Sequence, residues 1–87
     1  MKLLYCLKCH SMVRLVEYER SCECKACKGR YIDAVRAVYS GPALPIGIDN
    51  ASFKHAISMQ PKRGMGISFK AFIIPEKCAT FKKVSDV

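Results

Sequence analysis

Long apolar runs are missing from this sequence: none approaches the roughly 20 residues that a membrane-spanning helix needs. The apolar stretch at residues 3–7 is interrupted by Cys6 and closed by Lys8, so it is far too short for the hydrophobic region of a signal peptide. Internal repeats, low-complexity tracts and linkers are absent as well. We therefore expect a single domain over residues 1–87 that stays in the cytoplasm and has no membrane partner.

Side chains that could perform acid-base or nucleophilic catalysis are also few. The chain has seven Asp and Glu residues and two His residues, and no carboxylate pair, nucleophile motif or phosphate-binding glycine motif can be assembled from them. His55 falls within a predicted helix, where a solvent-facing position explains it more simply than catalysis. Cys78 is better explained as a small buried hydrophobe than as a nucleophile. We expect that the protein is not an enzyme.

Acidic side chains are outnumbered by 15 Lys and Arg residues, which gives a formal net charge of +8. Four thiolates on one divalent cation would lower this charge to about +6. A basic protein favours acidic partners such as nucleic acid, a nucleotide or an acidic protein surface. A surface that is basic merely for solubility accounts for the same charge, so the charge alone does not identify a partner.

Cysteine is the residue type that the sequence has in excess, with six in 87 residues. A core of this size is marginal without a metal, disulfides or a partner. In a reducing compartment, closely spaced cysteines are more often metal ligands or redox thiols than disulfides. A thioredoxin-like dithiol would open a helix in a βαβ pattern, and no such pattern surrounds these cysteines. We therefore expect a metal site.

The cysteine spacing defines the first half of that site and leaves the second half open. Cys6 and Cys9 are separated by two residues, a spacing at which one turn directs both sulfurs to a common centre. Cys24 and Cys27 repeat this spacing, whereas Cys22 and Cys24 share one face of an extended strand. Four sulfurs suit one zinc ion, with iron as the competitor, and we favour zinc because no redox partner region is evident. Four cysteine ligands leave no open coordination position, so the zinc should be structural.

The remaining pattern predicts an α+β fold, in which an N-terminal zinc ribbon (residues 1–30) continues into a small antiparallel sheet with one helix (residues 31–87). Prolines, capping residues and hydrophobic alternation suggest the boundaries of the elements in the second half. The expected elements are a strand at 31–39, an extended loop through Pro42 and Pro45, a helix at 51–60, a strand at 67–74 that is buried on both faces at its end, and a short strand at 80–84.

A longer pattern covers nearly the whole chain and consists of SCEC at 21–24, GRYID at 29–33, YSGP at 39–42, PIGI at 45–48, NASF at 50–53 and AFIIP at 71–75. It resembles small uncharacterised zinc-ribbon-like proteins of bacteria and their phages. The resemblance implies that the zinc ligands are Cys6, Cys9, Cys22 and Cys24, with Cys27 in place of Cys22 as the alternative. Those relatives usually have glycine after the last ligand, where this chain has Lys25.

Three hypotheses for function follow, and the first is a protein-interaction module. The resemblance favours it, since its phage association suggests an inhibitor of a host system, and the long segments at 41–49 and 60–66 are of the kind that carries function. The second is a nucleic-acid-binding zinc ribbon, because basic and tyrosine side chains are interleaved in residues 1–36. The third is binding of a small anionic ligand such as a nucleotide at the start of the predicted helix. The candidate residues for this ligand are Arg30, Arg36, Gly47 and Asn50. The oligomeric state is left open.

Overall fold

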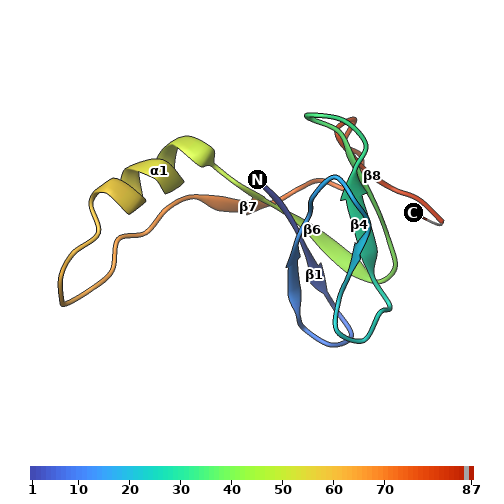
Figure 1. Ribbon diagram of the computed structural model, residues 1–87, viewed down its shortest axis with the longest axis horizontal. Coiled ribbons are helices and arrows are strands. Elements are labelled where there is room, and N and C mark those ends of the chain that lie inside the picture. Colours follow the sequence, from blue (N-terminus) through green and yellow to red (C-terminus); the bar gives the residue numbers. More distant parts are fainter. Residues whose placement is uncertain (86) are drawn as a thin grey trace.

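The protein is built from two four-stranded sheets and one helix, as seen in a computed structural model that describes residues 1–85 and 87 (Figure 1). Sheet A has the order β2-β1-β6-β7, with β1 Lys2–Cys6, β2 Met12–Arg14, β6 Ala43–Ile48 and β7 Ala71–Ile73. Sheet B has the order β3-β4-β5-β8, with β3 Arg20–Ser21, β4 Lys28–Tyr31, β5 Ala37–Ser40 and β8 Phe81–Lys83. The predicted α+β class is confirmed.

The sheets differ from the single antiparallel sheet expected for the second half. Sheet B is mixed, because β8 pairs with β5 in parallel while every other pair is antiparallel. The prediction of one strand at 31–39 was wrong, because the chain reverses direction between β4 and β5. The Asp33 carboxylate accepts the backbone N–H groups of Val35 (2.9 Å) and Arg36 (2.7 Å), and this side-chain turn outweighs the β-branched content of the segment.

Strand β6 is the second departure, because an extended loop was expected around its prolines. Pro45 lies inside β6 between β1 and β7, opposite Leu4. Its carbonyl accepts the N–H of Ile74 at 2.9 Å, and the N and C=O of one residue point to the same side of an antiparallel strand. The nitrogen of Pro45, which has no hydrogen to donate, therefore points toward Ile74, one residue past the end of β7. The proline costs sheet A one hydrogen bond, at the end of the β6–β7 pairing.

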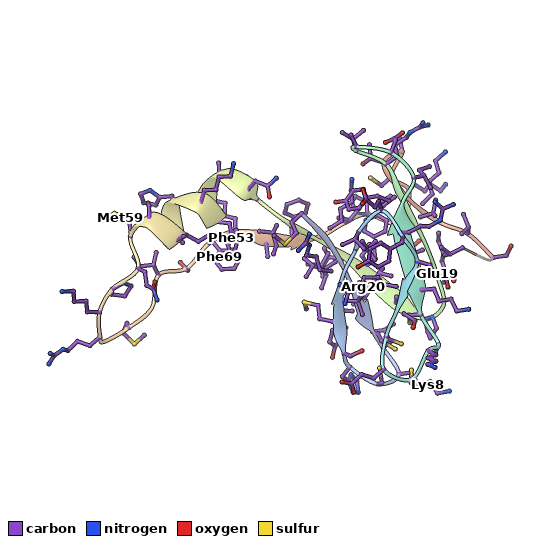
Figure 2. All side chains as sticks on the ribbon, viewed as in Figure 1. Lys8, Glu19, Arg20, Phe53, Met59 and Phe69 are labelled. Carbon is purple, nitrogen blue, oxygen red and sulfur yellow. The ribbon has the colours of Figure 1, made fainter. Side chains whose placement is uncertain are left out.

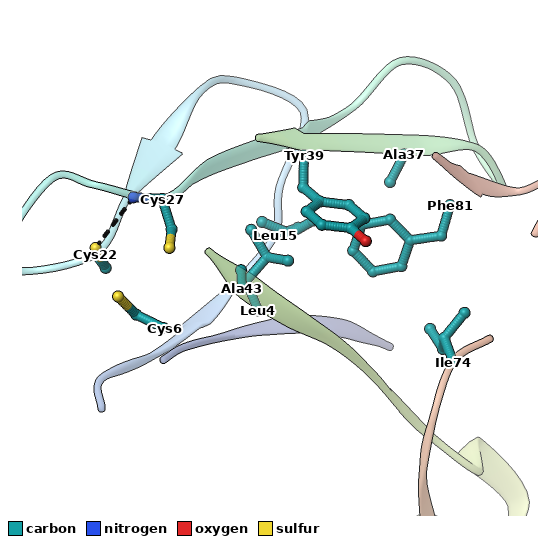
Figure 3. Close-up of a cluster of buried hydrophobic side chains, with 10 residues drawn as sticks. All are labelled: Leu4, Cys6, Leu15, Cys22, Cys27, Ala37, Tyr39, Ala43, Ile74 and Phe81. Atoms are coloured by element: carbon teal, nitrogen blue, oxygen red, sulfur yellow. Dashed lines mark hydrogen bonds between the residues drawn. The ribbon is translucent and has the colours of Figure 1, made fainter. Parts of the chain in front are cut away.

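The core lies between the two sheets and runs into the cysteine-rich turns (Figure 3). At one end Phe81 is fully buried, and its ring meets that of Tyr39 edge-on with centroids 5.1 Å apart. Leu4 and Leu15 fill the middle, and the sulfurs of buried cysteines lie at the other end. The core therefore depends on what holds those sulfurs together.

Helix α1 Asn50–Ser58 agrees with the prediction to within about two residues at each end, and Asp49 caps it by accepting the Ser52 N–H at 3.2 Å. None of its residues is buried, because the helix projects away from both sheets (Figure 1). The chain returns to β7, all of whose residues are exposed, and the next residue, Ile74, is buried. The prediction that the strand at 67–74 is buried on both faces at its end was therefore wrong for β7.

We call residues 50–73, from the start of α1 to the end of β7, the arm, and the remainder the body. The arm accounts for much of the elongation of the molecule, whose principal extents are 44 × 26 × 22 Å. Over the residues that the structure describes, no helix has the length and apolar character to cross a bilayer.

Gly41 and Gly64 both have positive φ, but they differ in how much space an added side chain would find. Gly41 has φ +94°, and an added Cβ would lie 2.1 Å from the Ala26 carbonyl oxygen, whereas Gly64 has φ +90° with nothing within 4 Å. Gly64→Ala should cost about 1–2 kcal/mol, the strain of the left-handed conformation. Gly41→Ala adds a backbone collision and should cost on the order of 3 kcal/mol. Thermal melts of both variants measure the difference, and equal losses would contradict the packing of Gly41 against residue 26.

Candidate metal centre

Two turns at the same end of the body bring four cysteine sulfurs together. Cys6 ends β1 and Cys9 lies on the turn that follows, and Cys22 and Cys24 lie on the turn between β3 and β4. All four sulfurs lie within 4.8 Å of one another, and all are free thiols. A tetrahedral zinc with Zn–S bonds of about 2.3 Å requires sulfurs roughly 3.8 Å apart. The Cys6–Cys24 distance of 3.7 Å and the Cys22–Cys24 distance of 3.4 Å fit this requirement.

The two turns are closed in the same way, although their cysteine spacings differ. The N–H of Cys6 donates to the carbonyl of Ser11 at 2.9 Å, and the N–H of Cys22 donates to the carbonyl of Cys27 at 3.1 Å. Each closing bond therefore joins residues that are five positions apart. Ser11 and Cys27 occupy equivalent positions in the two turns, so Cys27 closes the second turn through its backbone carbonyl.

Each turn contains one residue in the left-handed conformation. His10 has φ 63° and Lys25 has φ 61°, values that glycine adopts without cost and other residues adopt under strain. Lys25 follows Cys24 directly and adopts this conformation although it is not a glycine. The ring Nδ1 of His10 lies 2.9 Å from the Tyr5 hydroxyl, and His10 is not part of the sulfur cluster.

Two backbone N–H groups point at the sulfur of Cys6. The N–H groups of Cys9 and Lys8 both point at Cys6 Sγ from 3.4 Å. The Cys9 N–H lowers the pKa of the Cys6 thiol most, burial opposes it, and the Lys8 N–H lowers it further. The net pKa is lowered, which favours the thiolate that a metal ion requires.

Ser11 links the two turns through its side chain. Its hydroxyl lies 3.1 Å from Cys9 Sγ, to which it donates, and it accepts the N–H of Glu23 at 3.4 Å. Together with backbone donors, including the N–H of Ser11 itself, this hydrogen bond lowers the pKa of Cys9 to about 5. The cysteine spacing alone contains no signal for this role, because the link to Glu23 forms only when the turns meet.

Cys24 and Cys27 differ in how their thiols are held. The N–H of Ala26 lowers the pKa of Cys24, but the neighbouring Cys22 sulfur and burial outweigh it and raise the pKa to about 11. For Cys27, burial is the largest cause and raises the pKa to about 12, followed by the Cys6 and Cys22 sulfurs. The sulfur of Cys27 is not one of the four that lie together, so the geometry makes Cys27 the poorer candidate for a metal ligand. Its N–H donates to Cys22 Sγ at 3.4 Å, as Figure 3 shows.

The four residues expected to bind an anion do not line a common site. Arg36 forms an ion pair with Asp33 at 2.6 Å, and Arg30 lines a groove between residues 14–18 and 30–34. Gly47 and Asn50 line another groove, where the Phe72 ring covers Gly47 and the amino terminus donates to Asn50 Oδ1 at 3.1 Å. Anion binding at the helix start therefore stays a prediction, and the Asp49 carboxylate already satisfies one donor there.

Comparisons with protein-family models, with curated proteins and with solved structures find no match for this chain. The resemblance to zinc-ribbon-like proteins of bacteria and phages therefore stays a prediction. What the structure defines is a small α+β protein whose clustered cysteines can hold a metal ion.

We predict one zinc ion per chain, bound by the four clustered cysteines. Cys22→Ser should therefore release zinc and lower the melting temperature sharply, because metal binding supplies part of the folding free energy. Cys27→Ala should retain the zinc, since it removes a buried thiol outside the cluster and keeps its backbone carbonyl. Elemental analysis and melts with and without a chelator measure both effects. Zinc retained in Cys22→Ser and lost in Cys27→Ala would reassign the fourth ligand.

Ser11→Ala should weaken zinc binding about tenfold, the lower range for partners of metal ligands, because the Cys9 thiolate loses a donor. Competition with a chromophoric chelator measures the dissociation constant, and raising the pH should narrow the difference as the Cys9 thiolate becomes easier to form. Ser21→Ala on the exposed strand β3 is the matched control and should bind zinc as the wild type does. Equal affinity in both variants at neutral pH would show that Ser11 only joins the turns.

Proposed function

We propose that this chain is a small non-enzymatic zinc-binding protein that acts as a protein-interaction module, in which the metal-stabilised body presents the arm to a partner protein. Support for zinc comes from the donor set, since four cysteine sulfurs within 4.8 Å of one another favour zinc over hard cations. A site with four sulfur ligands has no open position for a substrate, so its role is structural.

The observation that carries the interaction proposal is the exposure of the arm. Large apolar side chains are exposed along the whole of it, namely Ile57, Met59, Met65, Ile67, Phe69, Phe72 and Ile73. Met65, near the end of the loop after α1, is 90% exposed. Exposed apolar side chains that are concentrated on one segment are typical of interaction sites.

A protein partner fits this surface better than nucleic acid does. Interfaces with nucleic acid are more polar and more positively charged than those between proteins, and their binding relies on many phosphate contacts. The arm combines four cations with seven exposed large apolar side chains. An inhibitor of a host system, as the phage resemblance implies, is the specific form of this proposal, and the identity of the partner tests it.

The test is a pull-down from cell lysate with zinc-loaded protein, before and after nuclease treatment, comparing wild type with Ile57→Ser/Ile67→Ser. We expect a protein that survives the nuclease, is lost in the arm variant, and binds the purified wild type again after identification. Tyr18→Ser/Val35→Ser is the matched control, because it removes exposed apolar side chains from the body. Retention that disappears with nuclease would favour the nucleic-acid hypothesis, and retention unaffected by the arm variant would place the interaction on the body.

A further inference from the structure

Strand β7 leaves one side of its backbone without a neighbouring strand. In the described part of the chain β7 is the last strand of sheet A, and nothing in the sheet order lies beyond it. Lys70 accepts the N–H of Asp49 and Ile74 donates to the carbonyl of Pro45, both at 2.9 Å. Backbone groups alternate in direction along an antiparallel strand, so those of Ala71 and Ile73 point away from β6. An edge of this kind is a template for another strand.

The chain that forms this edge also borders an apolar hollow in the arm. Residues 67–70 approach β7 without pairing in a sheet, and they face α1. Phe53 of α1 and Phe69 of the returning chain meet edge-on with centroids 4.8 Å apart, as Figure 2 shows. The hollow has a volume of about 560 Å³, and its apolar lining includes Phe53, Ile57, Ile67 and Phe69. It is concave and large enough to receive apolar side chains.

Charge on the arm has a single sign. The arm carries Lys54, Lys62, Arg63 and Lys70, and all seven acidic residues of the chain lie outside residues 50–73. Edge strands are often protected by lysine side chains, and the edge strand β8 of sheet B follows this rule with exposed Lys82 and Lys83. Strand β7 has the sequence AFI and contains no charge at all.

We propose that an extended acidic segment of a partner protein adds to sheet A as a strand beside β7, with alternate apolar side chains seated in the hollow of the arm. This proposal rests on the function proposed above and names the chemistry of the partner. Hydrogen bonds from the Ala71 and Ile73 backbone supply the pairing, apolar contacts supply the selectivity, and the cations of the arm select acidic residues between them.

Other occupants fit these features less well. A second copy would bring its own cationic arm against this one, with no acidic residue in either arm to offset the repulsion. The hydrocarbon of a bilayer offers no partner for the free backbone groups of Ala71 and Ile73. Nucleic acid offers phosphates to the cations but leaves the apolar hollow without a matching surface.

The first test is selection of linear 12-residue peptides from a random display library on the zinc-loaded protein. We expect enriched peptides with net negative charge and apolar residues at alternate positions. A synthetic copy of the strongest peptide should slow amide exchange at Ala71 and Ile73. Methylating its alternate peptide nitrogens on the pairing side should weaken binding about tenfold, because the ladder loses its hydrogen bonds. Added salt should weaken it as well.

Charge variants provide the matched comparison for the same synthetic peptide. Lys62→Glu/Arg63→Glu/Lys70→Glu should weaken its binding at least about tenfold by replacing attraction with repulsion. Lys82→Glu/Lys83→Glu changes the other lysine-bearing edge strand and should leave the affinity unchanged. Circular dichroism and zinc content confirm that both variants stay folded.

The outcomes separate this inference from the proposed function. If enriched peptides bind equally well when methylated, or if no acidic peptide is enriched while a partner protein still depends on the arm, strand addition is wrong and the interaction module stands. If Ala71 and Ile73 are already protected in a concentration-dependent way, a second copy occupies the edge and the inference is overturned. If neither peptides nor lysate proteins depend on the arm, both proposals fail.

Discussion

The convergence of four cysteine sulfurs at the meeting point of two turns is the constraint on which the rest of the molecule depends. One turn belongs to sheet A and the other to sheet B, so the cluster joins the two sheets at one end. The hydrogen bond with the Cys22 sulfur and burial raise the pKa of Cys24, and without a cation several thiolates this close would also repel one another. A bound metal ion would remove this repulsion, and the packing of Leu4, Leu15 and Phe81 would then depend on metal content.

The features that could be predicted from the sequence are those that depend on residues close together in the chain. The cysteine spacing and the resemblance together named Cys6, Cys9, Cys22 and Cys24, and these are the four sulfurs that the structure brings together. Helix α1 was found because its start and end depend on neighbours in sequence, Asp49 and Pro61. These features are settled within a few residues of one another, so they can be recognised without knowledge of the fold.

Features that depend on distant segments were missed. Pro45 is tolerated inside β6 because β7 ends beside it, a fact that no local pattern contains. The segment at 31–39 has strand-like composition, but the Asp33 side chain turns it into a reversal. The alternation at 67–74 predicted a buried strand end, yet β7 is exposed at the edge of sheet A in the described part of the chain. The Ser11 link to Glu23 likewise exists only after both turns have formed.

The place of the arm in the chain also has a consequence for proteolysis. Its loop at 59–66 is exposed, and a protease that cuts there would meet little resistance from packing. The fragment after the cut would still contain β7, paired with β6, and β8, paired with β5, with Phe81 fully buried between the sheets. The two fragments would therefore stay associated and keep the cluster of four cysteines, all of which lie in the first fragment. A nicked protein of this kind would migrate as intact under native conditions and separate only on denaturation.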